Sequence, residues 1–270
     1  MTEKFVGYFR LIEACARPGC PVCRCLVAES RAYLGALLYE QVTDPETRRA
    51  LRRSWGFCNW HTWMLPDVES SAFGAAILCE DLVTRALRRT QRLRRGSRVA
   101  ARRWLAALVG WRWRPALVEM HERRAPCPAC VDTAQTQAHY LETLVRFVDD
   151  EVLRAAYAQS DGLCVPHAIL AVEQGSETAR VETLVARTRE AWARIGRDLA
   201  AFVGKHDHRN REPYTEAEAT SRSRAFEMLA GARGVDLTSM GGLATGPPIP
   251  PPLGAPRGTR GAPRDTPTGS

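Results

Sequence analysis

The chain has 270 residues, a hydrophobic fraction of 45% and a net charge of +8, which is the composition of a globular protein with one large or two small domains. No run approaches the ~18 apolar residues that a membrane-spanning helix needs, and residues 1–15 lack the order of a secretory signal. We therefore expect a cytoplasmic location, where the nine cysteines point to metal ligands more readily than to disulfides.

The first third of the chain is typical of amphipathic helices. Apolar spacing predicts helices over residues 3–16 and 24–42. A second, shorter helix follows, because Asp44 is a good capping residue and Pro45 fits the first helical position. We expect this helix to end near Trp55, where Gly56 stops it.

A long helix is predicted over about 71–95, followed by a connector rich in arginine and tryptophan over 97–125. Residues 85–124 hold thirteen arginines and two glutamates, a balance that attracts nucleic acid or an acidic protein partner. Candidate contacts are Arg88, Arg89, Arg94 and Arg95. Composition offers a plainer explanation, since the chain has 36 arginines and two lysines. The segment 104–111 resembles an interfacial membrane helix, but we favour a helix packed on the protein body with its arginines extending outward.

The middle of the chain repeats the first module. A shift of 107 residues lays the Cys-Pro-x-Cys motif of residues 20–23 on that of 127–130, and a shift of 106 lays Cys-x-x-His of 58–61 on that of 164–167. Apolar and polar positions between the motifs align as well, so we infer a duplication. The second copy predicts helices over 130–147 and 150–159.

Two further helices, over 177–203 and 216–229, precede a tail from residue 241 that has no hydrophobic periodicity and is predicted to be disordered. The expected fold class is all-α: duplicated helical-hairpin modules, each stapled by a Cys₃His zinc site, with long flanking helices. The expected domains are 1–96, with the N-terminal helix and first zinc repeat; 97–125, the connector; 126–240, with the second zinc repeat and C-terminal helices; and the tail 241–270.

Each repeat offers one complete set of tetrahedral zinc ligands. The predicted sets are Cys20, Cys23, Cys58 and His61 in the first copy, and Cys127, Cys130, Cys164 and His167 in the second. A helical hairpin between the two halves of each set would return the chain to its starting point, so that the metal closes the open end of the hairpin. Four protein ligands leave no position for a reacting water, which favours structural zinc, two ions per chain.

Other uses of these cysteines stay open. An iron–sulfur cluster is chemically allowed, which makes a redox or iron–sulfur sensor one alternative function, and disulfides apply if the compartment differs. Haem attachment is excluded, because Arg24 and Val131 stand where it needs histidine. The cysteines at 15, 25 and 79 have no counterpart in the second copy and are expected to be small buried side chains.

A polar cluster after the long C-terminal helix is the second candidate site. It contains Lys205, His206, Asp207, His208, Arg209 and Arg211. Such groups bind phosphate, a metal or an acidic partner, or supply acid–base chemistry, which makes an enzyme another alternative function. We favour the simpler interpretation, a solvated helix end whose basic residues meet the negative end of the helix dipole. The preferred hypothesis is a zinc-binding helical protein of unknown cellular role that acts as a protein- or nucleic-acid-binding adaptor.

Over about residues 4–232 the chain resembles a bacterial family, the domain of unknown function numbered 6062. The motifs that carry the resemblance are residues 19–23, 33–40, 56–61 and 74–82, the second Cys/His set, and a C-terminal block with Lys205, His206, Asp207, Arg209 and Arg224. The chain departs from the family where an aromatic residue is expected near Ser221, since Arg222 stands there. The resemblance implies the domain extent and the metal ligands, and no known activity.

Overall fold

The computed structural model describes residues 4–69, 71–94, 124–206, 210–233 and 235. Within these ranges the protein is helical and contains no strand, which confirms the all-α prediction. The helices are α1 (Val6–Cys15), α2 (Pro21–Glu40), α3 (Pro45–Ser54), α4 (Asn59–Met64), the 3₁₀ turn η1 (Leu65–Asp67), α5 (Ala72–Arg94), α8 (Pro128–Arg146), α9 (Glu151–Gln159), α10 (Val165–Gln174), α11 (Thr178–Lys205) and α12 (Glu216–Ala230).

Two helices begin earlier than their apolar spacing predicts. We expected starts at residues 24 and 130, but α2 begins at Pro21 and α8 at Pro128, inside the Cys-Pro-x-Cys motifs. Proline is favoured at the first helical position because its fixed φ suits the helix and its missing N–H group would have no helical partner there. Each motif is therefore the first turn of a long helix.

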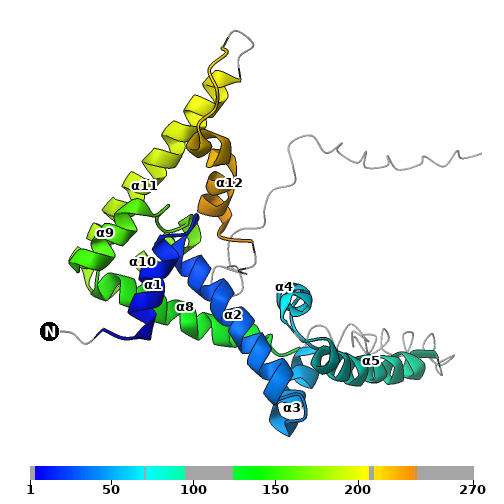
Figure 1. The fold of residues 1–270 in the computed structure, drawn as a ribbon. Coiled ribbons are helices and arrows are strands. Elements are labelled where there is room, and N and C mark those ends of the chain that lie inside the picture. The colour runs from blue at the N-terminus through cyan, green and yellow to red at the C-terminus, as the bar shows by residue number, and fades with distance from the viewer. Residues whose placement is uncertain (1–3, 70, 95–123, 207–209, 234, 236–270) are drawn as a thin grey trace, which may run out of the picture.

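The centre of the molecule is the antiparallel pair of α2 and α8, which Figure 1 shows side by side. Ser30 in α2 lies 3.1 Å from Thr133 in α8 between their hydroxyl oxygens, and farther along Tyr140 donates a hydrogen bond of 2.8 Å to Glu29. As the residue numbers fall along α2 they rise along α8, so the N-terminus of each helix lies toward the C-terminal end of the other.

Two hydrophobic cores lie along this pair. The larger one joins α1 and the first turns of α2 with α8, α9, α10 and α11, and contains Leu11, Leu26, Leu144, Leu153, Leu163 and Leu184. The smaller one joins the C-terminal half of α2 with α3, η1, α5 and the first turn of α8, and contains Leu34, Leu37, Leu51, Leu65, Leu78 and Ala129. Both cores draw on both predicted repeats.

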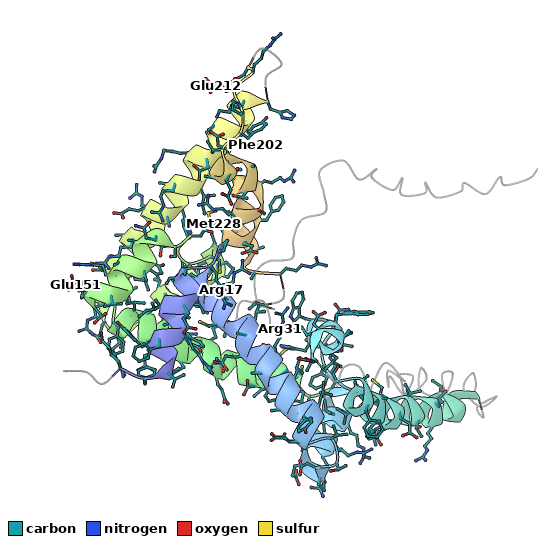
Figure 2. The ribbon with its side chains drawn as sticks, in the orientation of Figure 1. Arg17, Arg31, Glu151, Phe202, Glu212 and Met228 are labelled. Atoms are coloured by element: carbon teal, nitrogen blue, oxygen red, sulfur yellow. The ribbon has the colours of Figure 1, made fainter. Side chains whose placement is uncertain are left out.

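Helices α11 and α12 form an antiparallel pair that extends from the larger core (Figure 1). A capping box starts α12: the Thr215 side chain accepts from the Glu218 backbone, and the Glu218 side chain accepts from the Thr215 backbone. Lys205 at the end of α11 donates to Glu218 at 2.9 Å, which fastens the two helices together. In Figure 2, Phe202 and Glu212 mark this outer end of the pair.

Several predictions fall outside the described residues. These are most of the connector 97–125, the tail 241–270, and the candidate residues Arg95, Asp207, His208 and Arg209. The domain boundaries drawn around the connector and the tail therefore stay predictions. Among the helices that are described, none combines the length and the apolar character that a bilayer crossing requires.

Candidate metal centres

The four ligand pairs occupy equivalent positions at four helix N-termini. Cys20, Cys58, Cys127 and Cys164 are the residues that precede α2, α4, α8 and α10, and each second ligand lies three residues later in the first turn. This spacing places both side chains of a pair on the same side of the helix end. The positive end of the helix dipole also favours a thiolate over a thiol there.

The structure brings these pairs together in two compact groups. Cluster 1 consists of Cys20, Cys23, Cys164 and His167, and cluster 2 of Cys58, His61, Cys127 and Cys130. In each cluster the four ligand atoms lie within 4.8 Å of one another. All eight predicted residues thus belong to two Cys₃His groups that could hold metal ions.

The predicted grouping of these residues was wrong. Each Cys-Pro-x-Cys pair meets the Cys-x-x-His pair of the other repeat. The reason is helix length: at about 1.5 Å per residue, α2 spans about 30 Å and α3 only about 15 Å. Helix α3, which follows α2, therefore ends well short of Cys20, and Cys58 instead lies near the start of the antiparallel helix α8.

The distances within each cluster suit a tetrahedral zinc ion. Bonds of about 2.3 Å to sulfur and about 2.0 Å to nitrogen give tetrahedron edges of about 3.8 Å between sulfurs and about 3.5 Å between sulfur and nitrogen. The observed sulfur–sulfur distances are 3.8 Å for Cys23–Cys164 and 3.6 Å for Cys58–Cys130. The Nδ1 atoms of the histidines lie 3.1–3.4 Å from sulfurs in cluster 1 and 3.3–3.6 Å in cluster 2.

Without a bound cation, the side chains of cluster 2 shift one another's pKa values strongly and in opposite directions. Hydrogen bonds from Cys127 and Cys130 hold the pKa of Cys58 far below its ordinary value. Hydrogen bonds with Cys127 and Cys58, in contrast, raise the pKa of Cys130. Burial opposes the charging of His61, but its hydrogen bonds with Cys127 and Cys58 outweigh burial and raise its pKa to about 9. Negative charge on one sulfur thus resists charge on the next, and a bound cation would relieve this repulsion.

Cluster 1 is closed to solvent. The exposed fractions of Cys20, Cys23, Cys164 and His167 are 2%, 0%, 0% and 0%. The backbone N–H of Ala232, just after α12, donates to the sulfur of Cys23 at 3.4 Å, so the segment that follows α12 lies over cluster 1. The Nε2 atom of His167 is buried and has no hydrogen-bond partner among the described residues. Its Nδ1 faces the three sulfurs, as a ligand nitrogen should.

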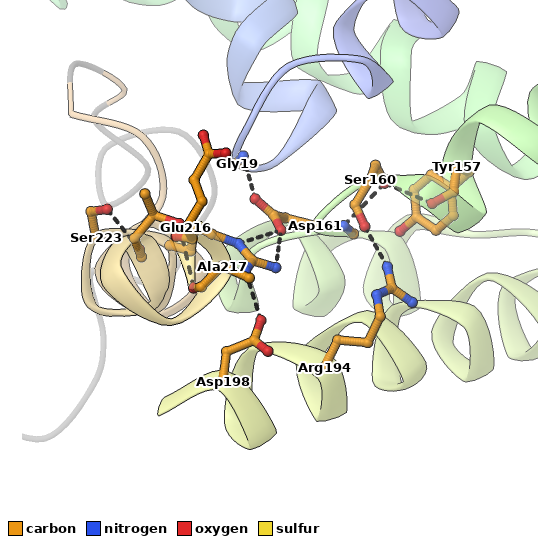
Figure 3. Close-up of polar contacts among 12 residues, drawn as sticks. Gly19, Tyr157, Ser160, Asp161, Arg194, Asp198, Glu216, Ala217 and Ser223 are labelled. Atoms are coloured by element: carbon orange, nitrogen blue, oxygen red, sulfur yellow. Dashed lines mark hydrogen bonds and ion pairs between the residues drawn. The ribbon is translucent and has the colours of Figure 1, made fainter. Parts of the chain in front are cut away.

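A polar network fixes the two turns that carry the cluster 1 ligands. Asp161, three residues before Cys164, accepts from the backbone N–H of Gly19 at 2.7 Å and from Arg224 of α12 at 2.7 and 2.8 Å. Arg224 also donates to Asp198 of α11 at 2.9 Å. Figure 3 shows Asp161 between Gly19 and Asp198. We call Asp161, Arg224, Asp198 and Gly19 the latch.

Cluster 2 is more open. His61 and Cys127 are nearly buried, with exposed fractions of 3% and 9%, but Cys58 and Cys130 are half-buried. A hollow of about 440 Å³ lies against three of the ligands, Cys58, Cys127 and Cys130. Just before Cys127, the backbone N–H of Ala125 donates a hydrogen bond of 3.0 Å to the carbonyl of Arg53.

The other predicted binding residues lie in two different places. Lys205 and His206 hold the end of α11 against α12 and the segment before it, since Lys205 pairs with Glu218 and His206 Nδ1 lies 3.3 Å from the Tyr214 hydroxyl. Arg88 and Arg89 line a hollow between α3 and α5, far along the chain from this end. Arg94 ends α5, and Arg211 is exposed.

None of the nine cysteines forms a disulfide. Cys15 and Cys25 are buried, as expected, and burial raises the pKa of each thiol to about 12. Cys79 is exposed on α5, so its expected burial was wrong.

The sequence alone indicated no role for Asp161 or Asp198, and it indicated Arg224 only as part of a block of family resemblance. The asymmetry of the repeats was the available signal, because Asp161 aligns with Trp55 and Gly19 with Pro126.

The chain matches one family model over residues 8–234, that of a family of unknown function, DUF6062. No curated protein matches it, and neither does any solved structure. The match covers both clusters and the latch, and it confirms the resemblance that the paired motifs indicated. The chain belongs to the family of unknown function DUF6062.

Proposed function

We propose that this chain is a helical scaffold held together by two structural zinc ions, and that it acts in the cytoplasm as a binding protein, or adaptor, for a partner attracted by its basic surface. The observation that carries the proposal is the exchange of ligands: each Cys₃His cluster takes one pair from each predicted repeat. An ion bound there would join segments more than 140 residues apart in cluster 1 and more than 60 apart in cluster 2, which are separations that an unfolded chain closes only at an entropic cost.

Zinc is favoured by the donor set and the spacing. Three thiolates and one imidazole at tetrahedral distances match structural zinc sites, and the resulting net negative charge lies at two helix N-termini, where the dipoles stabilise it. Thiolate ligands also suit a reducing compartment. Four protein ligands in each cluster leave no coordination position for substrate, so the role must come from the surface that the ions keep in shape.

The test begins with metal analysis of the purified chain. We expect about two zinc ions per chain, no visible absorbance, and loss of helical circular dichroism when a strong chelator removes the metal, because binding free energy at such sites is folding free energy. Iron with a visible absorption band would replace the zinc assignment with an iron–sulfur one. A metal-free chain that keeps its cooperative melting would contradict the structural role.

A further inference from the structure

The hollow between α3 and α5 is a strongly charged concave surface. It has a volume of about 600 Å³ and is lined by Arg48, Arg52, Glu80, Asp81, Thr84, Arg85, Arg88 and Arg89. Five arginines against two carboxylates give the lining a net charge of +3. We call this feature the arginine hollow.

Helical periodicity explains why these side chains converge. Arg48 and Arg52 are four residues apart on α3, so they lie on one face of that helix. On α5, Asp81, Arg85 and Arg88 follow at intervals of four and three residues and form a charged stripe along the facing side. The hollow is therefore built by two rigid helices and not by a flexible loop.

Asp81 orders the arginines of α3 without neutralising the hollow. Arg52 donates two hydrogen bonds of 2.7 Å to the two oxygens of Asp81, and Arg48 lies 3.6 Å from the same carboxylate. Hydrogen bonds from Arg52 hold the pKa of Asp81 below its ordinary value, so this carboxylate stays charged. The Nε atom of Arg48 is buried and has no acceptor among the described residues.

The supply of hydrogen-bond donors in the hollow far exceeds the supply of acceptors. A guanidinium carries five N–H donors in a planar fork that suits two oxygens of one anion. Arg85 places its guanidinium over the ring of Trp55, 5.6 Å from the centroid, at the end of α3. This contact positions Arg85 but provides no anionic acceptor, and no described carboxylate forms an ion pair with its guanidinium.

We propose that the arginine hollow binds the phosphodiester backbone of a nucleic acid. This proposal rests on the binding role proposed above and names its partner. Phosphate oxygens match the forked guanidinium donors, and arginine contacts to phosphate position a protein on nucleic acid without reading sequence. The expected binding is thus salt-dependent and shows little base preference.

An acidic protein fits the hollow less well. Protein interfaces concentrate their binding energy in apolar or aromatic anchors near the centre of the contact. Among the described residues that line the arginine hollow, Thr84 is the one without a charge, and none is apolar. A partner here gains charge-assisted hydrogen bonds and almost no apolar burial, which is the pattern of phosphate recognition.

The experiment measures fluorescence anisotropy of a labelled single-stranded oligonucleotide and of a duplex of the same sequence with the zinc-loaded full chain, from about 50 to about 200 mM salt. The test variant is Arg85→Glu with Arg88→Glu. The matched control is Arg189→Glu with Arg197→Glu, two exposed arginines on α11 that give the same change in net charge. Arg88→Gln, a single change at an exposed side chain, serves if the double variant does not fold.

We expect the hollow variant to weaken binding at least about tenfold more than the control does, and its salt slope to fall by about 0.7 per lost contact on a single strand. Arg88→Gln should weaken binding by a smaller factor in the same direction. A difference in affinity between the single strand and the duplex shows which form of nucleic acid the arginine hollow prefers. Zinc content is measured on every sample.

Three results would overturn the proposal: no binding of the wild-type chain at low salt, equal weakening by the hollow and control variants, or equally effective displacement by polyglutamate or by inorganic pyrophosphate. The zinc content separates this failure from that of the proposed scaffold. A chain with two zinc ions that binds no oligonucleotide loses the nucleic-acid partner and keeps the scaffold. A chain without zinc loses the scaffold whatever the oligonucleotide does.

Discussion

The two Cys₃His clusters share their donor atoms and their placement at helix N-termini but differ in what surrounds them. Cluster 1 lies within the larger core, its four ligands almost fully buried, with the C-terminal block above it. Cluster 2 lies at the edge of the smaller core, with two half-buried sulfurs beside a hollow. Identical ligand sets thus sit in a closed and an open environment.

Two aligned positions account for much of this difference. Gly19 donates its backbone N–H to Asp161 in the latch, whereas the aligned Pro126 has no N–H to donate. Asp161 itself aligns with Trp55, which packs against Arg85. The two predicted repeats therefore share the candidate ligands but differ in the residues that cover them. Ligand motifs alone do not predict how tightly each cluster would hold a metal.

The largest expected effects come from two single variants, each of which removes one ligand from one cluster. Cys23→Ser should empty cluster 1 and abolish cooperative folding of the larger core, because a structural zinc contributes on the order of 10 kcal/mol, comparable to the whole stability of a domain. Cys130→Ser should also lose one zinc but keep most of the helical signal, since the larger core stays intact. Metal analysis and circular dichroism measure both.

Cys79→Ser is the matched control for these variants, because this exposed cysteine belongs to neither cluster. It should retain two zinc ions and the wild-type melting temperature. If Cys130→Ser unfolded the chain as completely as Cys23→Ser, the contrast between a closed and an open cluster would be wrong.

Zinc release to a chromogenic chelator should separate the clusters in time. The ion in cluster 2 should leave at least about tenfold faster, because its half-buried sulfurs need little opening, whereas cluster 1 requires local unfolding of the covering segment. Absorbance of the chelator complex gives the two rates. The fast phase should be missing in Cys130→Ser, and its persistence there would show that the open cluster had been misassigned.

A smaller effect is expected from opening the latch with Arg224→Gln. The change removes the hydrogen bonds to Asp161 and Asp198, whose carboxylates are mostly buried, and should cost about 2 kcal/mol, or about 5 °C in melting temperature. The slow phase of zinc release should accelerate while the fast phase stays unchanged. Differential scanning calorimetry and the chelator assay measure the two effects.

Arg222→Gln on the same helix is the control for the latch, because this side chain is exposed and a surface change there should stay within about 0.5 kcal/mol. Equal losses in both variants would mean that α12 as a whole, and not the latch, stabilises cluster 1. An unchanged slow phase in Arg224→Gln would remove the latch from the explanation of metal retention.

Local sequence was sufficient for most of the secondary structure. Asp44 and Pro45 start α3, and Gly56 and Gly162, with φ of 90° and 73°, end the segments before α4 and α10. The starts of α2 and α8 were placed three and two residues late, because the apolar stripe that guided the prediction begins after the first turn, whereas the proline signal lies within it. Capping and periodicity act over a few residues, so the sequence displays them directly.

The sequence by itself determined most of the helices, the eight candidate ligands and their division into four pairs three residues apart, but gave no range for α4 or α10. Only the tertiary structure decided which pairs meet, because that depends on the unequal lengths of α2 and α3 and on the antiparallel packing of α2 against α8. The convergence of Gly19, Asp161, Asp198 and Arg224 was decided in the same way. Contacts between distant segments follow from how whole helices pack, and no short motif encodes that packing.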